Sequence, residues 1–297
     1  MTDFSLIAEE GVSPLAQQPA LYVVATPLGN LRDVTLRALA VLKTVDVIAA
    51  EDTRHSQGLL DAFGIRKRLV AVHEHNEMEA AEGLIGRLAR GEHVALISDA
   101  GTPAVSDPGA RVVERIRAAG YPVVPVPGAC AAIAALSVSG LVGGSFRFVG
   151  FLPPKSAARR AVLADLCGDS GMLVFYEAPH RVVECINDLL DTLGGERTLV
   201  IAREMTKRYE EIVRLPLDEA PAWLAADVNR TRGEFVLIVS GALPVQGMNR
   251  ETERVLKVLL DVLPLKTAVT ATAEITGMSR KVLYARALAL RGEDLPL

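Results

Sequence analysis

The sequence predicts an α/β protein with two α/β domains and a small helix-turn-helix-like unit at its C-terminal end. Short runs of Val, Ile, Leu and Ala alternate with stretches of helical periodicity. Hydrophobic residues make up 50% of the chain but aromatic residues only 4%, as expected for aliphatic parallel strands. A length of 297 residues is also sufficient for two buried cores.

The first domain, expected over residues 20–144, alternates apolar runs with amphipathic stretches, which is typical of a mostly parallel sheet. Gly91 and Gly120 stand where two expected helices end. Asp107 before Pro108 is typical of an N-cap followed by a first-turn proline. Strands are expected at 21–26, 47–50, 69–72, 94–97 and 123–126, and helices at 33–43, 53–63, 76–90 and 108–119.

A second α/β domain is expected over residues 145–246, after a glycine-rich boundary at 143–145. Pro153 and Pro154 end its first strand. Its strands are expected at 146–151, 172–176, 198–202, 210–215 and 235–240, and its helices at 156–166, 179–193 and 216–225. Residues 1–19, ahead of both domains, are expected to form a mobile tail.

Residues 247–297 form the third expected unit, which follows a linker at 242–246. Gly277 stands in a tight turn before the last helical pattern, and Ser279 is a suitable N-cap. Two helices around such a turn predict a helix-turn-helix-like unit. Its helical patterns cover 250–262, 267–276 and 279–290.

Charge and cysteine usage exclude several classes of function. The formal net charge is −4, so the molecule is not a general polyanion binder, and any RNA contact must come from local basic patches. Three cysteines without a CxxC spacing argue against a zinc site or disulfide framework and for a cytoplasmic location. A surface loop explains His73-Glu74-His75 better than a metal site, so we expect no metal. Neither a signal peptide nor a membrane span is expected.

Three loops of small residues follow strands of the expected first sheet, at 27–30, 99–109 and 127–130. Loops at strand ends are the usual ligand position of an open α/β sheet. The absence of GxGxxG and GxxxxGK[ST] patterns excludes a dinucleotide fingerprint and a P-loop. Asp99 is either a ligand contact or a carboxylate that caps a backbone N–H. Glu51 and Asp52 are either an N-cap pair or one wall of the same site.

Basic residues gather at several places, and each cluster is either a solvated face or a phosphate contact. Two clusters stand at strand ends of the second domain, where they would form a phosphate-binding strip if they lined a cleft mouth. A third lies in the C-terminal unit. The residues expected to bind RNA are Lys155, Arg159, Arg160, Arg203, Lys207, Arg280 and Lys281.

Four motifs together resemble a known family: ATPLGNL at 25–31, AEDTR at 50–54, the run 99–109 and FYEAPHR at 175–181. Over roughly residues 20 to 290 the chain resembles the tetrapyrrole-methylase superfamily of S-adenosylmethionine (SAM) enzymes. Within it, the motifs are similar to the RsmI family, the 2′-O-ribose cytidine methyltransferases of small-subunit (16S) ribosomal RNA. One departure is Pro-Gly-Ala-Cys at 127–130 in place of Pro-Gly-Pro-Ser, which removes a side-chain hydroxyl.

The resemblance implies that SAM lies folded in a cleft between two domains and that the chain methylates rRNA as a homodimer. Glu177, Lys155 and Glu204 are the candidates for handling the proton of the acceptor hydroxyl. The residues implied to hold SAM are Pro27, Leu28, Gly29, Asn30, Asp99, Gly101, Thr102, Pro103, Ser106, Pro127, Gly128, Cys130, Ala131, Tyr176, Gly233 and Glu234.

Two other functions stay open. A methylase of a small tetrapyrrole would share the fold and the SAM loops. A non-enzymatic nucleic-acid-binding regulator would use residues 250–297. The basic strand ends and the C-terminal unit argue against the first alternative, and the ligand-type loops argue against the second.

Overall fold

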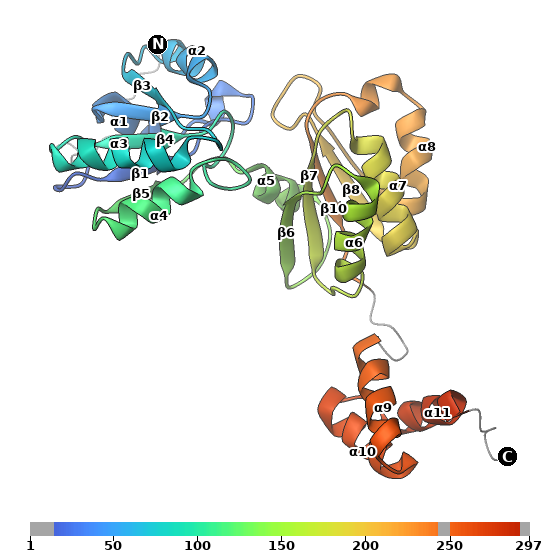
Figure 1. Ribbon diagram of the computed structural model, residues 1–297. Coiled ribbons are helices and arrows are strands. Elements are labelled where there is room, and N and C mark those ends of the chain that lie inside the picture. Colours follow the sequence, from blue (N-terminus) through green and yellow to red (C-terminus); the bar gives the residue numbers. More distant parts are fainter. Residues whose placement is uncertain (1–14, 243–249, 292–297) are drawn as a thin grey trace.

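The computed structural model describes residues 15–242 and 250–291. Figure 1 shows two sheets, each with its own helices, and a third body of three helices set apart from them. Separate groups of buried apolar side chains lie in the two sheet bodies and in the helical body. The fold class predicted from the sequence is confirmed.

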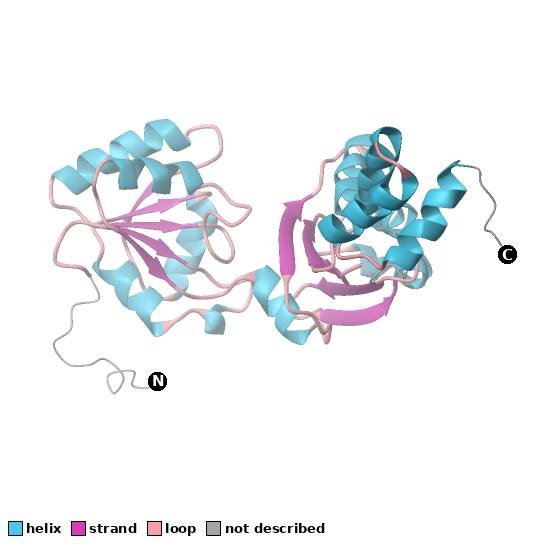
Figure 2. Ribbon diagram, turned by 90° about the horizontal axis from the view of Figure 1, so that it is seen from below, coloured by secondary structure: helices cyan, strands magenta, loops and turns pink. Residues whose placement is uncertain are grey.

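All strands of the first sheet run parallel, in the order β3–β2–β4–β1–β5. Helices α1 (Leu36–Thr44) and α2 (Thr53–Ala62) cover one face, and α3 (Glu77–Ala89) and α4 (Ala110–Ala118) cover the other (Figure 2). Burial on both faces explains why the strands are nearly uninterrupted aliphatic runs. These strands are β1 (Leu21–Val24), β2 (Val47–Ala50), β3 (Arg68–Ala71), β4 (Val94–Ile97) and β5 (Val123–Val126).

The second sheet is mixed, in the order β6–β7–β10–β8–β9, with β6 and β7 parallel and the other pairs antiparallel. One face is covered by α6 (Ser156–Leu166), α7 (Val182–Leu193) and α8 (Ala220–Ala225). The strands are β6 (Phe146–Phe151), β7 (Met172–Glu177), β8 (Thr198–Arg203), β9 (Glu211–Pro216) and β10 (Phe235–Val239).

Helix α5 (Ala131–Val138) connects the two sheet bodies, and the sequence analysis did not delimit it. It follows β5 of the first sheet, yet Ala132 and Ala135 pack against the open face of the second sheet, beside Val174 and Val236. Figure 2 shows this helix between the two sheets. The loop at 127–130 therefore lies where the two domains meet.

Some helix starts differ from expectation. Helix α4 begins at Ala110, and its N-cap is Gly109 with a φ of 124°, so the prediction that Asp107 caps it is wrong. The Gly109 N–H is bound by the Glu77 carboxylate instead, which frees Asp107 to face elsewhere. Helix α7 begins at Val182 rather than at Pro179. The helix expected over 216–225 is a 3₁₀ turn, η3 (Leu217–Glu219), followed by the short α8.

The C-terminal body consists of α9 (Arg250–Val262), α10 (Leu265–Thr276) and α11 (Arg280–Arg291), packed around Leu256, Val269 and Leu283. Gly277 ends α10 in the left-handed conformation, with a φ of 71°. Most of the expected linker at 242–246 and residues 1–14 of the expected tail lie outside the described residues. Leu15, within that expected tail, packs against the core of the first domain.

Candidate active site

A cavity of about 390 Å³ lies between the two sheet bodies. The first domain contributes strand-end loops, and the second contributes the ends of β7 and β10. Eight of its lining residues were predicted from the sequence, seven as SAM contacts and Glu177 as a candidate for handling the proton. They are Leu28, Gly101, Thr102, Cys130, Ala131, Tyr176, Glu177 and Glu234.

The three first-domain loops are tied to one another by hydrogen bonds. The Thr26 N–H donates to the Gly101 carbonyl at 2.8 Å, and the Gly101 N–H donates back at 3.0 Å. The Thr102 hydroxyl donates to the Ala129 carbonyl at 2.9 Å, which joins the second loop to the third. Gly101 has a φ of 85°, a conformation that side chains disfavour, and an added Cβ would lie 3.3 Å from Leu28 Cδ2. These loops therefore form one preformed wall of the cavity.

Other residues predicted as SAM contacts lie beside the cavity rather than on its wall: Pro27, Gly29, Asn30, Asp99, Pro103, Ser106, Pro127, Gly128 and Gly233. Several of them shape the loops. The Asn30 carboxamide accepts from the Arg32 N–H at 3.1 Å, and Asp99 accepts from the Asp52 N–H at 3.2 Å. A Cβ on Gly128 would lie 2.8 Å from the Ala25 Cβ, so the third loop packs directly on the first.

Asp107 is a wall residue that sequence reasoning missed, because it was assigned to a helix cap. Burial raises the pKa of its carboxyl, although a hydrogen bond with Ser98 works against the shift. Burial likewise raises the pKa of Glu51, and the neighbouring carboxylates of Asp107 and Asp99 add to the effect. Asp52, in contrast, caps α2 by accepting from the Arg54 N–H at 2.7 Å and the His55 N–H at 3.3 Å.

Apolar wall residues were also missed, notably Phe151, Met205, Phe235 and Val236. The last two begin β10, directly after the predicted residues Gly233 and Glu234. Their signal in the sequence was therefore their position next to a predicted contact, at the start of an expected strand.

Hydrogen bonds and an ion pair position the residues of the second-domain wall of the cavity. The Glu177 side chain is buried, accepts from the Ala178 N–H at 2.8 Å and pairs with Arg181 Nε at 3.1 Å. The Tyr176 hydroxyl accepts from the Ala132 N–H at 3.1 Å, which ties β7 to α5, and burial raises the pKa of this phenol. The rings of Phe148 and Phe151 pack edge-on against Tyr176.

Lys207 joins the two domains at the cavity edge. Its ammonium lies 2.9 Å from Glu204 Oε1 and 2.9 Å from Glu234 Oε2. A Cβ built on Gly29 of the first domain would lie 2.5 Å from Lys207 Cγ, so the lysine stem rests on that loop. Burial alone would raise the pKa of Glu204, but the Glu234 N–H and Lys207 lower it. Lys207, predicted to bind RNA, is thus engaged by two carboxylates.

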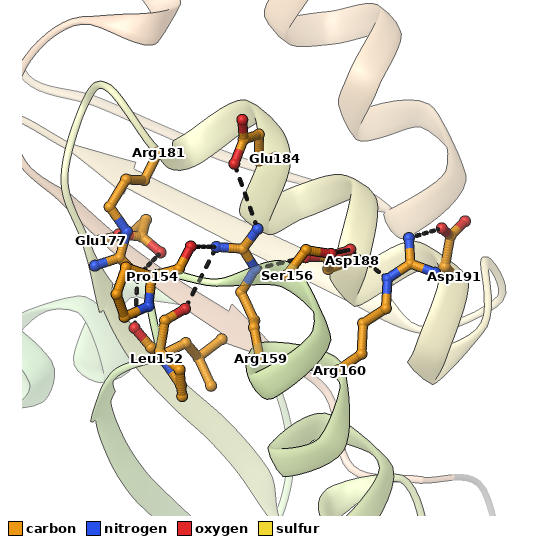
Figure 3. Close-up of polar contacts among 11 residues, drawn as sticks. Leu152, Pro154, Ser156, Arg159, Arg160, Glu177, Arg181, Glu184, Asp188 and Asp191 are labelled. Atoms are coloured by element: carbon orange, nitrogen blue, oxygen red, sulfur yellow. Dashed lines mark hydrogen bonds and ion pairs between the residues drawn. The ribbon is translucent and has the colours of Figure 1, made fainter.

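Two arginines of the predicted phosphate strip of the second domain, Arg159 and Arg203, are buried. Figure 3 shows the polar contacts around Arg159 and Arg160. Arg159 has no exposed surface, and its Nε donates to Asp188 Oδ2 at 2.6 Å. Its NH1 group donates to the Pro154 carbonyl at 3.4 Å. Arg160 pairs with Asp188 and, at 2.6 Å, with Asp191. The prediction that Arg159 binds RNA is wrong, because its guanidinium is buried and paired with Asp188 inside the domain.

Arg203 requires the same correction. Only 8% of this residue is exposed, and its guanidinium pairs with Glu211 at 3.0 Å and donates to the Asn229 and Arg232 carbonyls. It therefore fastens the loop that contains η4 (Val228–Thr231), and its one unpartnered donor, Nε, is buried and out of reach of a phosphate. Lys155, the remaining member of the strip, is exposed at the N-terminus of α6.

Comparison with known proteins defines the class. Residues 20–221 match the family model described as tetrapyrrole (corrin/porphyrin) methylases, and residues 247–291 match that of the RsmI C-terminal HTH domain. The protein is a methyltransferase of the tetrapyrrole-methylase class. A Pseudomonas aeruginosa protein called ribosomal RNA small subunit methyltransferase I is 51% identical over 277 residues, 92% of this chain and 98% of that protein. Its Vibrio cholerae counterpart is 49% identical, with 93% and 96% covered. The chain belongs to the ribosomal RNA small subunit methyltransferase I family.

Solved structures share the fold. Uroporphyrin-III C-methyltransferase from Thermus thermophilus superposes with a TM-score of 0.53 at 22% identity, covering 75% of this chain and 94% of that one. The methyltransferase CobJ superposes with a TM-score of 0.58 at 19% identity, covering 76% and 95%. Among the described residues, no helix has the length and apolar character needed to cross a membrane.

Proposed function

We propose that this protein transfers a methyl group from SAM to the ribose 2′-hydroxyl of a cytidine in 16S rRNA of the small ribosomal subunit, in the cytoplasm. The family supports rRNA as the substrate. The relatives are called ribosomal RNA small subunit methyltransferase I, and the match covers nearly their whole length. The observation that carries the cofactor assignment is the cavity between the sheets, with its apolar and acidic walls.

The residues present fit SAM. A cavity of about 390 Å³ lies within the range of small-molecule sites. Leu28, Phe235 and Val236 offer apolar surface for an adenine ring, and Asp107 and Glu234 offer carboxylates for cationic and hydroxyl groups. Asp107 has no ion-pair partner within 4 Å in the described part of the chain. When bound, SAM supplies an electrophilic methyl group on a positively charged sulfur.

The chain's own contribution is positioning and proton handling. The hydrogen-bonded loops and the Tyr176–Ala132 contact hold the two walls in place, so the reacting groups can be aligned in line. Of the three candidates for handling the hydroxyl proton, Glu177 is the one that lines the cavity. Glu177 is paired with Arg181, as Glu204 is with Lys207, but neither Glu204 nor Lys155 is among the residues that line the cavity. We therefore assign the proton-handling role to Glu177.

We also propose that the protein is a homodimer. Large apolar side chains are exposed along α5 and the segment that follows it, namely Ile133, Val138, Val142 and Phe146. Exposed apolar side chains of this kind are a feature of subunit interfaces. Light scattering of the full chain tests the dimer.

A direct assay separates the proposed reaction from methylation of a tetrapyrrole. Labelled SAM is offered with unmethylated small ribosomal subunits or with a uroporphyrinogen. We expect label in the RNA and, after nuclease digestion, in 2′-O-methylcytidine. Label in the porphyrinoid alone would overturn the substrate assignment, and label in neither would support a non-enzymatic role.

Two glycines provide a matched test of the cofactor cavity. Gly101 and Gly120 share a φ of 85°, but Gly101 lines the cavity, whereas nothing lies within 4 Å of a Cβ on Gly120. Valine at either position imposes similar backbone strain. Calorimetry should show that Gly101→Val abolishes SAM binding and that Gly120→Val does not. Equal losses in both variants would mean that strain, and not the cavity, is responsible.

A further inference from the structure

A second cavity, of about 530 Å³, lies between α10 and α11 in the C-terminal body. Its polar lining consists of Lys266 and Thr270 from α10 and of Arg280, Lys281 and Tyr284 from α11. These two helices flank the turn at Gly277, which ends α10 and sets the direction of α11. We call this site the α10–α11 groove.

The groove lies in a positively charged body. Residues 250–291 contain eight basic and four acidic side chains, a formal net charge of +4, although the whole chain is at −4. The remaining part of the protein is therefore acidic and repels a polyanion. An RNA strand that reaches this molecule is attracted first to the C-terminal body.

The groove gathers cations that have no close carboxylate partner. Outside the groove, Arg254 of α9 is also exposed and forms no ion pair among the described residues. Outside the groove lining, Glu253 is paired with Lys257 at 3.1 Å and with Arg286 at 2.7 Å. Lys266 and Lys281 have no carboxylate within 4 Å in the parts of the chain that the structure describes. Arg280 approaches Glu274 at 3.8 Å, but both side chains are mostly exposed, so water screens that pair.

Tyr284 adds a flat apolar surface to the same groove. Its ring packs against the core of the C-terminal body while it lines the groove, so its orientation is fixed by packing. Aromatic rings beside basic side chains are the usual platform for unpaired bases of a single-stranded nucleic acid. A double-stranded RNA helix offers no exposed base face to such a ring.

We propose that the α10–α11 groove binds a single-stranded segment of the RNA substrate. Lys266, Lys281 and Arg280 neutralise its phosphates, and one base stacks on Tyr284. This inference rests on the proposed function for the identity of the RNA. It assigns to the C-terminal body the task of holding the substrate, while the cavity between the two sheets holds the methyl donor.

The test compares two double variants of the full-length chain. Lys266→Ala with Lys281→Ala removes two groove cations, and Arg254→Ala with Lys257→Ala removes two cations from α9, outside the groove. The probe is a short, fluorescently labelled single-stranded RNA, titrated at several salt concentrations. The groove variant should lose affinity, and its plot of log affinity against log salt should flatten by up to about 1.4 units. The α9 variant should keep the wild-type slope.

Substitutions of Tyr284 test the stacking contact. Tyr284→Phe keeps the ring and should bind like the wild type, whereas Tyr284→Leu keeps only apolar bulk and should bind roughly tenfold more weakly. Circular dichroism verifies that each variant retains its helices. Equal affinity of all groove variants and the wild type would overturn the proposal, as would a hairpin duplex that competes as well as the single strand.

The outcome is separable from that of the proposed function. SAM binding by calorimetry and methyl transfer to ribosomal subunits are measured on the same variants. If the groove variants bind RNA normally while the wild type methylates rRNA, the groove assignment fails alone. If no rRNA is methylated but the groove variants lose RNA affinity, the groove assignment stands and the proposed reaction fails.

Discussion

Two clusters of basic residues look alike in the sequence but differ in the fold. One contains Arg159 and Arg160 in the first turns of α6, and the other contains Arg280 and Lys281 at the start of α11. Helix α7 packs against α6 and brings Asp188 between the two arginines. Helix α10 packs against α11 and brings another cation, Lys266, to the shared groove. The neighbouring helix decides whether a basic cluster becomes part of the core or a binding surface.

The energetic roles of the two clusters differ accordingly. A charge that is fully buried, such as Arg159, is tolerated only with its partners in place, and removing one partner leaves an uncompensated charge. An exposed cation such as Lys281 contributes little to folding and stays available to a ligand. The following predictions test this difference from the largest expected effect to the smallest.

Asp188→Asn should have the largest effect, a loss of about 3–5 kcal/mol in the free energy of unfolding. Asp188 is only 3% exposed and accepts from Ser156, Arg159 and Arg160. The amide therefore leaves the buried Arg159 guanidinium with only the exposed Glu184 carboxylate, at 3.6 Å, as a counter-charge. The single tryptophan, Trp223, packs on the second-domain core. Its fluorescence in a urea titration at pH 7 therefore reports on the domain concerned.

Asp191→Asn is the matched control. Asp191 also pairs with Arg160, but both of these side chains are about half exposed. Its loss should cost no more than about 1 kcal/mol. Comparable destabilisation by the two substitutions would mean that the buried network is no more important than a surface pair.

The pH dependence of stability gives a smaller, independent signal. Although burial alone would raise it, the pKa of Asp188 is lowered from its ordinary value of 3.8 by hydrogen bonds from Arg160, Arg159 and Ser156. A lowered pKa in the folded state means that this contribution is present above the ordinary value and is lost as the pH falls through the folded-state value. Wild-type second-domain stability should therefore fall more steeply below about pH 4 than that of Asp188→Asn. Parallel acid profiles would contradict the assignment.

The fold was largely predictable because its signals are local. Aliphatic runs gave β2, β4 and β5 with their observed bounds, since parallel strands buried on both faces need no alternation. The start of α4 was misplaced because Asp107-Pro108 has the chemistry of a cap, whereas the turn is made by Gly109 and the distant Glu77. The sequence near a strand does not reveal whether the end of that strand faces a second domain.

Part of the cavity wall was predicted through the family resemblance, which implied Gly101 as a SAM contact. The structure supplies a physical reason for that residue type, because Gly101 has a φ of 85°. Arg159 and Arg203 were misassigned because their partners, Asp188 and Glu211, lie on other elements whose packing no spacing rule reveals. Asp107 was missed because one carboxylate can serve as a cap or as a wall, and only the tertiary fold decides between them.

Lys207, at the boundary between the domains, combines features of both kinds of basic residue. It is paired with carboxylates, and it lies beside the cavity. A side chain on Gly29 displaces the lysine stem, so Gly29→Val should weaken SAM affinity about tenfold, or 1.4 kcal/mol. In a Lys207→Ala background the same substitution should cost much less, because nothing is left to displace. Calorimetry on the four proteins of this cycle measures the coupling. Additive losses would show that Gly29 acts on the ligand directly.

The smallest effect is expected at Lys155, the exposed cation at the start of α6. It has no ion-pair partner within 4 Å in the described residues, unlike Arg159 one turn further along. Lys155→Ala should leave the free energy of unfolding within about 0.5 kcal/mol of the wild type. If it contacts one phosphate, the salt slope of RNA binding should flatten by at most about 0.7–0.9 log units. Lys43→Ala provides the control, since Lys43 is also an exposed lysine, on α1 of the other domain. A slope change shared by both variants would reflect net charge alone, whereas a change confined to Lys155 would identify it as an RNA contact.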